Sequence, residues 1–218
     1  MFEVSPNLLN QVLEHFDEQP LLINDDRSLS FLDFFTETHN LSNSLEMNSQ
    51  ERIILCSENQ EFLLKSMLAL WMRRAVAVPL NPKFPKTQKK ELIQKIDGIT
   101  DANLSSDFHR LLKGNTTLSD QLKHEAKPQT RHLIDPEAWA TIFFTSGSTG
   151  SPKAVVHSLA SHFFSALGAN ELMPLYPGDR WLLSLPLYHV GGLAIFFRTL
   201  LSGAAMVIPS KNKSLAET

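Results

Sequence analysis

The sequence predicts an α/β fold in which parallel strands alternate with helices, and two observations carry this prediction. Apolar residues stand at consecutive positions in short runs such as residues 53–56, and this pattern is typical of strands buried on both faces of a sheet. Two such runs, residues 52–56 and 75–80, enclose a stretch at 60–71 with helical spacing. A strand, a helix and a second strand in this order indicate a βαβ unit.

The composition is that of a folded protein with small-molecule partners. With 218 residues, of which 43% are hydrophobic, the chain is long enough for one full domain or for parts of two. The formal net charge of -3 gives no electrostatic reason to expect nucleic acid or an anionic membrane as a partner. Cys56 is the only cysteine, which excludes an intrachain disulfide and a zinc site of several cysteines, and is typical of a reducing compartment.

We expect no targeting segment and no membrane span. The N-terminus carries Glu3 where a secretory signal peptide would carry basic charge, so a cytoplasmic protein is expected. The longest apolar stretch, residues 190–209, contains three glycines and is interrupted by Arg198. We interpret it as a buried helix followed by a strand.

The first 45 residues predict a helix, a strand pair and a second helix. Ser5 offers a capping hydroxyl and Pro6 suits the first position of a helix, so the first helix is expected to start there. Its apolar stripe consists of Leu8, Leu9, Val12, Leu13 and Phe16. Two extended pieces, 21–24 and 28–30, surround a polar turn. Ser30 to Asp33 then has the pattern of a capping box, followed by helix to about residue 45.

Two prolines interrupt the chain after the βαβ unit. Pro82 and Pro85 are incompatible with a continuing strand or helix interior, and Thr87 is the expected cap of a helix over residues 88–96. Residues 114–136 are polar and predict a surface connection.

Strands and helices resume beyond this connection, so we expect a first α/β subdomain over residues 1–136 and the start of a second over residues 137–218. The expected order in the second part is a strand at 138–144, a glycine-rich turn, a short strand at 154–156, a helix at 159–172, a strand at 181–185, a helix at 192–201 and a strand at 204–208. No closing element follows, so this sheet would be incomplete within the chain.

The chemistry that the sequence reveals lies in residues 144–153. This segment follows a predicted buried strand and combines five hydroxyl side chains, two glycines and Lys153. Glycines let the backbone turn tightly and aim N–H groups at one point, hydroxyls add donors, and the lysine adds positive charge on a long stem. These groups suit a polyphosphate ligand. The segment departs from the Walker A pattern, because Pro152 replaces the second glycine and Ala154 stands where a magnesium-binding hydroxyl would be.

The motif TSGSTGSPK at residues 145–153 resembles the phosphate-binding loop of the adenylate-forming superfamily, which includes acyl-CoA synthetases, luciferases and the adenylation domains of peptide synthetases. Residues 75–82 and the LPLYH element at 185–189 are similar to further segments of these enzymes, whereas Ala154 departs from the commoner glycine. The resemblance implies the stacked αβαβα layers of the adenylate-forming N-terminal domain, incomplete in this chain.

Within the superfamily, residues 153–157 and 181–192 together with Arg198 most resemble the o-succinylbenzoate:CoA ligase family of menaquinone biosynthesis. This implies an AMP-forming acid–thiol ligase: ATP activates an aromatic dicarboxylate to an acyl-adenylate with release of pyrophosphate, and the acyl group then passes to the thiol of coenzyme A. The implied cofactors and co-substrates are ATP, Mg2+ and coenzyme A.

The resemblance also implies roles for individual residues. The ATP-binding set is Thr145, Ser146, Gly147, Ser148, Thr149, Gly150 and Lys153. Lys153 would in addition be catalytic, because it would balance charge on the departing pyrophosphate. His189 would border the substrate pocket, and Arg198 would neutralise the distal carboxylate of the substrate. A buried arginine without an anion is costly, so the alternative is that its charge reaches solvent along the alkyl stem.

Other conspicuous residues are expected to serve packing. His157 follows a strand and should pack or cap the next helix. Trp181, Phe196 and Phe197 have spacings that usually fill a core, and Cys56 lies in a predicted buried strand.

Several parts that the resemblance requires are missing from these 218 residues. The family also uses a Tyr-Gly-x-Thr-Glu segment for adenine and magnesium, an aspartate for the ribose and a lysine on a mobile C-terminal domain, so no metal ligand is assigned within this chain. We therefore expect the N-terminal part of a longer enzyme, inactive alone, with a homodimer as the family-level expectation. A different acid:CoA ligase, an amino-acid adenylation domain and a non-catalytic nucleotide-binding module remain open as alternatives.

Overall fold

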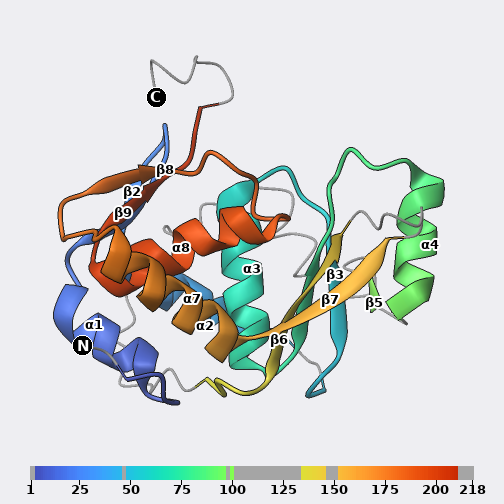
Figure 1. The fold of residues 1–218 in the computed structure, drawn as a ribbon, viewed down its shortest axis with the longest axis horizontal. Coiled ribbons are helices and arrows are strands. Elements are labelled where there is room, and N and C mark those ends of the chain that lie inside the picture. Colours follow the sequence, from blue (N-terminus) through green and yellow to red (C-terminus); the bar gives the residue numbers. More distant parts are fainter. Residues whose placement is uncertain (1–2, 46–47, 97–98, 101–133, 146–151, 211–218) are drawn as a thin grey trace. The chain divides into compact units, whose positions relative to one another are not determined.

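The computed structural model describes residues 3–45, 48–96, 99–100, 134–145 and 152–210, which form six helices and two sheets (Figure 1). The chain divides into two compact units that we describe separately. Unit 1 takes Met1–Phe35, Leu133–Ala138 and His157–Thr218, and unit 2 takes Thr36–His132 and Trp139–Val156. The predicted boundary near residue 136 stays a prediction.

Unit 2 contains a five-stranded sheet in the order β5-β3-β4-β6-β7. Its strands are β3 (Arg52–Leu55), β4 (Val76–Pro79), β5 (Ile99–Thr100), β6 (Trp139–Thr145) and β7 (Lys153–Ser158). The pairs β3–β4, β3–β5 and β4–β6 are parallel. The predicted βαβ unit is confirmed, because α3 (Gln60–Met72) connects the parallel neighbours β3 and β4.

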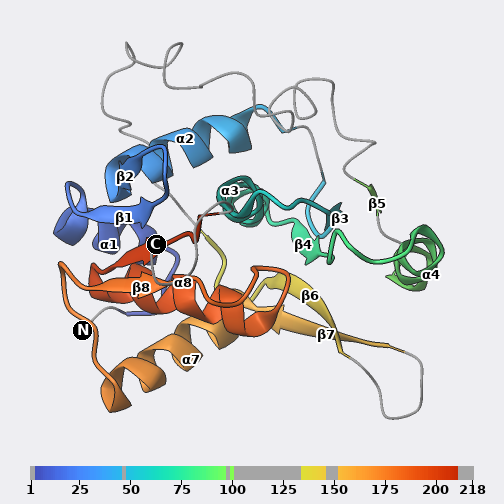
Figure 2. The same ribbon diagram turned by 90° about the horizontal axis from the view of Figure 1, so that it is seen from above.

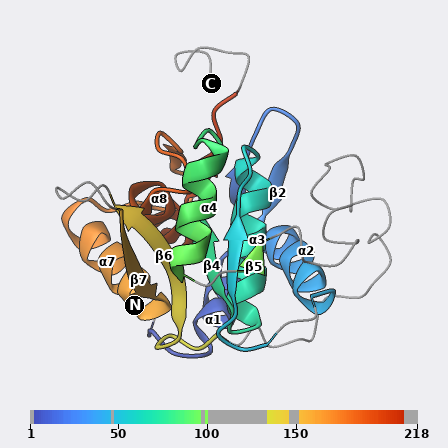
Figure 3. The ribbon, with the colours of Figure 1, turned by 90° about the vertical axis from the view of Figure 1, so that its right-hand side faces the viewer.

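Consecutive apolar residues in β3 and β4 are buried as a strand covered on both faces requires. One core cluster joins Ile54, Val76, Val78, Leu80 and Ile142 of the strand region with Leu92 and Ile96 of α4 (Lys86–Ile96), which lies beside the sheet (Figure 3). The indole of Trp71, at the end of α3, donates to the Ala140 carbonyl of β6 at 2.8 Å. Helix and strand are therefore joined by a satisfied polar group inside an apolar core.

A buried ion cluster fixes α3 against the part of α2 (Phe31–Asn43) that belongs to unit 2. The ammonium of Lys65 contacts Glu37 of α2 and also Glu61, one turn earlier in α3, at 2.6 Å. All three side chains are largely shielded from water, so the carboxylates offset the cost of burying the lysine charge.

Unit 1 contains a four-stranded sheet in the order β2-β1-β9-β8. Its strands are β1 (Pro20–Ile23), β2 (Ser28–Ser30), β8 (Arg180–Leu182) and β9 (Ala205–Val207). The predicted strand pair at the N-terminus is confirmed as an antiparallel hairpin, whose turn is closed by the Asn24 side chain accepting the N–H groups of Asp26 and Arg27 at 2.9 Å. The pairs β1–β9 and β8–β9 are parallel.

Three helices belong to unit 1, namely α1 (Leu8–Phe16), α7 (Leu159–Leu172) and α8 (Val190–Ser202). Helices α7 and α8 lie side by side (Figure 2), with Phe163 and Phe197 in edge-to-face contact at 5.0 Å. Helix α8 ends at Gly203, which has a left-handed φ of 71°. A Cβ on Gly203 would lie 2.6 Å from the Phe16 ring, so both conformation and space require glycine there.

Three local predictions are wrong. Helix α1 begins at Leu8 rather than at Ser5, because the Ser5 carbonyl accepts the Leu8 N–H in a turn that precedes the helix. Helix α4 begins at Lys86, so Thr87 lies inside it, and the Pro85 carbonyl accepts the Lys89 N–H at 3.0 Å.

The third wrong prediction concerns the end of β3. The strand stops at Leu55, and Cys56 follows it as a partly exposed residue. By contrast, the predicted capping role of Ser30 before α2 is confirmed, since its hydroxyl accepts the Asp33 N–H at 3.1 Å and donates to the Asp33 carboxylate at 2.9 Å.

Within the described residues, no helix combines the length and the apolar character that crossing a bilayer would require.

Candidate functional site

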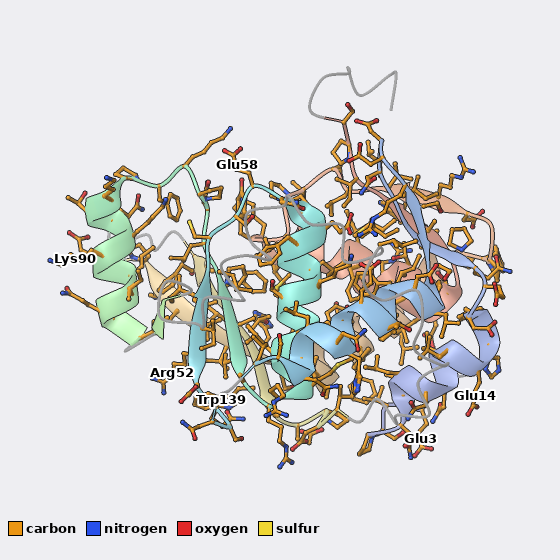
Figure 4. All side chains as sticks on the ribbon, turned by 180° about the vertical axis from the view of Figure 1, so that it is seen from behind. Glu3, Glu14, Arg52, Glu58, Lys90 and Trp139 are labelled. Atoms are coloured by element: carbon orange, nitrogen blue, oxygen red, sulfur yellow. The ribbon has the colours of Figure 1, made fainter. Side chains whose placement is uncertain are left out.

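Strand β6 carries the predicted phosphate-binding segment to the carboxyl edge of the unit 2 sheet. Arg52 and Trp139 begin β3 and β6 at one edge of this sheet, and Glu58, which follows β3, lies at the other (Figure 4). Because the pairing through β4 is parallel, Thr145 at the end of β6 belongs to the edge where the strands end. Open α/β sheets bind ligands at this edge.

The burial of β6 changes abruptly at its end. Ala140, Thr141, Ile142 and Phe143 are buried, whereas Thr145 is exposed. The buried part anchors the strand in the sheet, and its last residue, Thr145, is exposed at the edge. Of the predicted ATP-binding residues, Ser146, Gly147, Ser148, Thr149 and Gly150 lie outside the described residues, so their role stays a prediction.

Lys153 is the first residue of β7, which is the sheet neighbour of β6. The two ends that enclose residues 146–152 therefore belong to adjacent strands, and the arrangement is strand–segment–strand rather than the strand–loop–helix of a Walker A site. No hydrogen bond or ion pair joins the Lys153 side chain to another described residue, and the residue is exposed. Its ammonium can serve a ligand without first breaking an internal contact with these residues.

A second cation next to this segment escaped the sequence analysis. Lys95, near the end of α4, donates from its ammonium to the carbonyl of Pro152, immediately before Lys153. The residues are far apart in the chain, and α4 carries several other lysines, so no sequence signal distinguishes Lys95 from them. Only the packing of α4 beside the sheet identifies it.

His189 occupies the N-cap position of α8 with an extended backbone. Its side chain does not cap the helix, is exposed, and has a ring contact with Tyr188 at 5.0 Å. The chain before it packs tightly on the first turn of α8, since a Cβ on Gly192 would lie 2.3 Å from the Pro186 carbonyl oxygen. The imidazole is therefore not buried, and its predicted place at a substrate pocket stays a prediction.

Arg198 lies in the middle of α8 and is buried, with 8% of its surface exposed. Its Nε donates to the Asn170 Oδ1 at 2.8 Å, and its Nη2 donates to the Met173 carbonyl at 2.5 Å. The guanidinium also lies over the Trp181 ring, 4.3 Å from the centroid. Burial lowers the pKa of Arg198, but an arginine with this starting value stays charged at neutral pH.

The structure does not bring His189 and Arg198 together. The nine positions between them correspond to about 13 Å along a helix axis and about half a turn around it. The two residues can therefore only contact different parts of a ligand. Asn170 and Met173, which hold Arg198, were not identified from the sequence, because nothing in a helix end indicates which distant side chain it will meet.

Packing predictions near the site are largely confirmed. The His157 ring stacks on His162 at 5.2 Å, and His162 stacks on Phe197 at 5.0 Å with nearly parallel planes. Phe196 and Phe197 are fully buried, whereas Trp181 is half-buried beneath Arg198. Burial, with a smaller contribution from the charge of His157, lowers the pKa of His162 to about 3.

Among the residues that the structure describes, no group of three or more histidine, cysteine, aspartate or glutamate side chains is placed to hold a metal ion.

Comparison with known proteins identifies the family and agrees with the fold. The family model of AMP-binding enzymes matches residues 9–218. The 2-succinylbenzoate–CoA ligase of Salmonella typhimurium is 36% identical over 162 residues, covering 73% of this chain and 34% of that enzyme. The corresponding ligase of Bacillus subtilis is 25% identical over 217 residues, covering 95% of this chain and 44% of that enzyme.

A solved structure shares this fold. The o-succinylbenzoate CoA synthetase from Bacillus subtilis, in complex with the acyl-adenylate intermediate OSB-AMP, superposes with a TM-score of 0.75 at 25% identity, over 98% of this chain and 58% of that chain. The predicted α/β fold of the adenylate-forming N-terminal domain is thereby confirmed. The chain spans less than half the length of the curated relatives named above.

Proposed function

Since the chain belongs to the family of AMP-binding enzymes, we propose that the protein containing it is an AMP-forming acid–CoA ligase and that its acid is o-succinylbenzoate. The ligases of Salmonella typhimurium and Bacillus subtilis named above support this substrate. Menaquinone biosynthesis follows from the resemblance of the motifs to that ligase family. The relatives are much longer than this chain, so the proposal concerns the complete protein.

The observation that carries the proposal is the position of the TSGSTGSPK motif. Its described ends, Thr145 and Lys153, are exposed ends of adjacent strands, and β6 ends at the carboxyl edge of a largely parallel sheet. We assign the hydroxyls and N–H groups of residues 145–150, with the Lys153 ammonium, to the phosphates of ATP. Polyphosphate binding in this arrangement relies on the backbone, hydroxyls and one cation rather than on a helix terminus.

The proposed reaction has two steps. A carboxylate oxygen of the acid attacks the α-phosphorus of ATP, the bond to the bridging oxygen breaks, and pyrophosphate leaves with the electron pair. The thiol of coenzyme A then attacks the acyl carbon, loses its proton, and displaces AMP. Lys153 would stabilise the charge that develops on the pyrophosphate, and this stabilisation is largest when the cation is already in place. Mg2+ would enter on the ATP phosphates, where it neutralises charge.

The acid would lie along α8. His189, an exposed residue at the N-cap of α8, would border the acid, and the buried Arg198 would pair with the carboxylate that is not activated. Arg198→Ala in the complete enzyme is expected to raise KM for the dicarboxylate far more than for a monocarboxylate, because only the former loses an ionic partner. Equal effects on the two acids would remove this role.

Pyrophosphate exchange in the complete protein tests the function directly. We expect ATP–pyrophosphate exchange that depends on o-succinylbenzoate and not on fatty acids or amino acids, and a thioester product when coenzyme A is added. Exchange with a different acid would keep the ligase and change its substrate. ATP binding without exchange for any acid would indicate a nucleotide-binding module instead.

The cytoplasmic location, the homodimer and the subdomain boundary near residue 136 stay predictions. Sedimentation of the complete protein would decide the oligomeric state.

A further inference from the structure

Three neutral groups hold the guanidinium of Arg198 in place. Asn170 accepts from Nε at 2.8 Å and donates from its Nδ2 to the backbone carbonyl of Arg198 itself at 3.2 Å, so the amide contacts the residue twice. The Met173 carbonyl, at the C-cap of α7, accepts from Nη2 at 2.5 Å. The Trp181 ring covers one face at 4.3 Å. Orientation of the guanidinium is thus determined from three directions.

These contacts occupy the edge of the guanidinium formed by Nε and Nη2, and the edge formed by Nη1 and Nη2 is not used in the same way. The Nε and Nη2 donors point to Asn170 and Met173, whereas no acceptor among the described residues contacts Nη1. Arginine binds carboxylates through two parallel N–H donors, and the edge formed by Nη1 and Nη2 retains such a pair. Neither Asn170 nor Met173 nor Trp181 carries a charge, and no carboxylate of a described residue forms an ion pair with Arg198.

A buried cation that is oriented but not neutralised is suited to an anionic ligand. Neutral acceptors offset only part of the free energy that it costs to remove the guanidinium from water. The negative charge of a bound carboxylate would offset more of this cost. If the fold used Arg198 only to join α7, α8 and β8, an aspartate at position 170 would serve at least as well, because it would accept the same hydrogen bond and neutralise the charge.

We propose that Asn170 and Trp181 are positioning residues that orient the uncompensated charge of Arg198 toward the second carboxylate of an aromatic dicarboxylate. This inference rests on the proposed function and names the side chains that give Arg198 its specificity. Asn170 fixes the guanidinium without competing for its charge, and the Trp181 ring prevents it from tilting away.

Asn170→Asp in the complete enzyme separates this role from a structural one. The aspartate keeps the acceptor for Nε and introduces an internal counter-charge. We expect KM for o-succinylbenzoate to rise about tenfold or more, as for the loss of one charged hydrogen bond, with kcat changed less than about threefold. A monocarboxylate analogue that keeps the activated carboxylate and lacks the second one should have a KM that is insensitive to the substitution.

Asn10→Asp is the matched control, because it adds the same charge on α1 of the same unit. A melting temperature of Asn170→Asp equal to or above that of the unsubstituted protein would show that the fold is intact. An unchanged KM for the dicarboxylate would overturn the positioning role of Asn170. So would an equal rise in KM for the dicarboxylate and for the monocarboxylate analogue that lacks the second carboxylate. Absence of activity in the unsubstituted protein would instead contradict the proposed function.

The role of Trp181 is tested by a conservative pair. Trp181→Phe keeps an aromatic face beneath the guanidinium, and Trp181→Leu removes it. We expect Trp181→Leu to raise KM for the dicarboxylate about threefold to tenfold and Trp181→Phe to restore most of this loss. Equal effects of the two variants would overturn the stacking role of Trp181.

Discussion

Lys65 in α3 and Arg198 in α8 are both buried cations of helices, but the first contacts two carboxylates and the second contacts none among the described residues. In the cluster of Lys65, Glu37 and Glu61 the lysine charge is paired with carboxylates of the protein itself. Arg198 is held by an amide, a carbonyl and an aromatic ring. In our proposal, this difference separates a cation that joins two helices from a cation whose charge binds a ligand.

Lys153 is a cation in a third kind of environment, at the surface of its unit. It is exposed, and no described residue forms a hydrogen bond or ion pair with its side chain. A flexible cation of this kind can follow a polyphosphate whose charge moves during the reaction, whereas the fixed guanidinium of Arg198 suits a planar carboxylate that stays in place. The two proposed binding cations therefore correspond to two kinds of anion.

The largest expected effect is on the exposed cation. Lys153→Ala in the complete enzyme should lower the rate of acyl-adenylate formation by about 10²–10³-fold, because the developing charge on pyrophosphate loses its stabilising group. Lys90→Ala, at an exposed position of α4 (Figure 4), is the matched control and should leave the rate unchanged. Single-turnover measurement of pyrophosphate release decides the matter, and a loss below about threefold would show that Lys153 does not contact the phosphates.

The comparison of the two buried cations predicts different costs of removal. Lys65→Met leaves Glu37 and Glu61 without their cation and should lower the free energy of unfolding by about 3 kcal/mol. Arg198→Met removes a charge that no carboxylate among the described residues neutralises, and it should cost about 1 kcal/mol, mostly in lost hydrogen bonds. Urea denaturation of both variants measures the difference.

Replacing Glu37 and Glu61 by glutamine in the Lys65→Met background should recover most of the stability, since no carboxylate is then left unpaired. Equal costs for Lys65→Met and Arg198→Met would break the distinction between the two sites.

Much of the fold followed from the sequence because periodicity reports burial. The consecutive apolar residues of β3 and β4 and the helical spacing of α3 correctly predicted a parallel βαβ unit. The wrong predictions concern element ends. Ser5 and Thr87 have the side chains of caps, but the turn before α1 and the Pro85 carbonyl before α4 provide the acceptors instead. Cap propensity does not determine which acceptor the folded backbone brings into reach.

In the candidate site too, some residues could be predicted from the sequence and others could not. Thr145 and Lys153 could be found because one continuous motif contains them. Arg198 could be singled out as a charge in an apolar helix, but its partners Asn170, Met173 and Trp181 come from other elements of the chain. Such contacts depend on packing, and no local pattern encodes them.

His162 is a buried histidine, and its burial predicts that the free energy of unfolding depends on pH. The pKa of His162 is lowered to about 3 in the folded protein, whereas an unfolded histidine has a pKa of about 6.5. Between these values the unfolded chain binds a proton that the native state does not, so stability falls as pH falls. The free energy of unfolding should drop by about 2 kcal/mol between pH 7 and pH 5 from this residue.

His162→Gln should remove that part of the pH dependence, and His15→Gln, at an exposed position of α1, should not. Urea denaturation at several pH values between 5 and 7 measures the slopes. Identical slopes for the two variants would show that His162 is protonated in the native state over this range.

The smallest expected effect concerns Lys95, the exposed cation beside the motif. Its ammonium donates to the Pro152 carbonyl, and solvent weakens such an exposed contact. Lys95→Ala should therefore raise KM for ATP only about twofold to threefold, through a less fixed backbone before Lys153, with Lys90→Ala as the control. A tenfold or larger rise would show instead that Lys95 binds the phosphates directly, and the distinction between a ligand-binding Lys153 and a supporting Lys95 would then be lost.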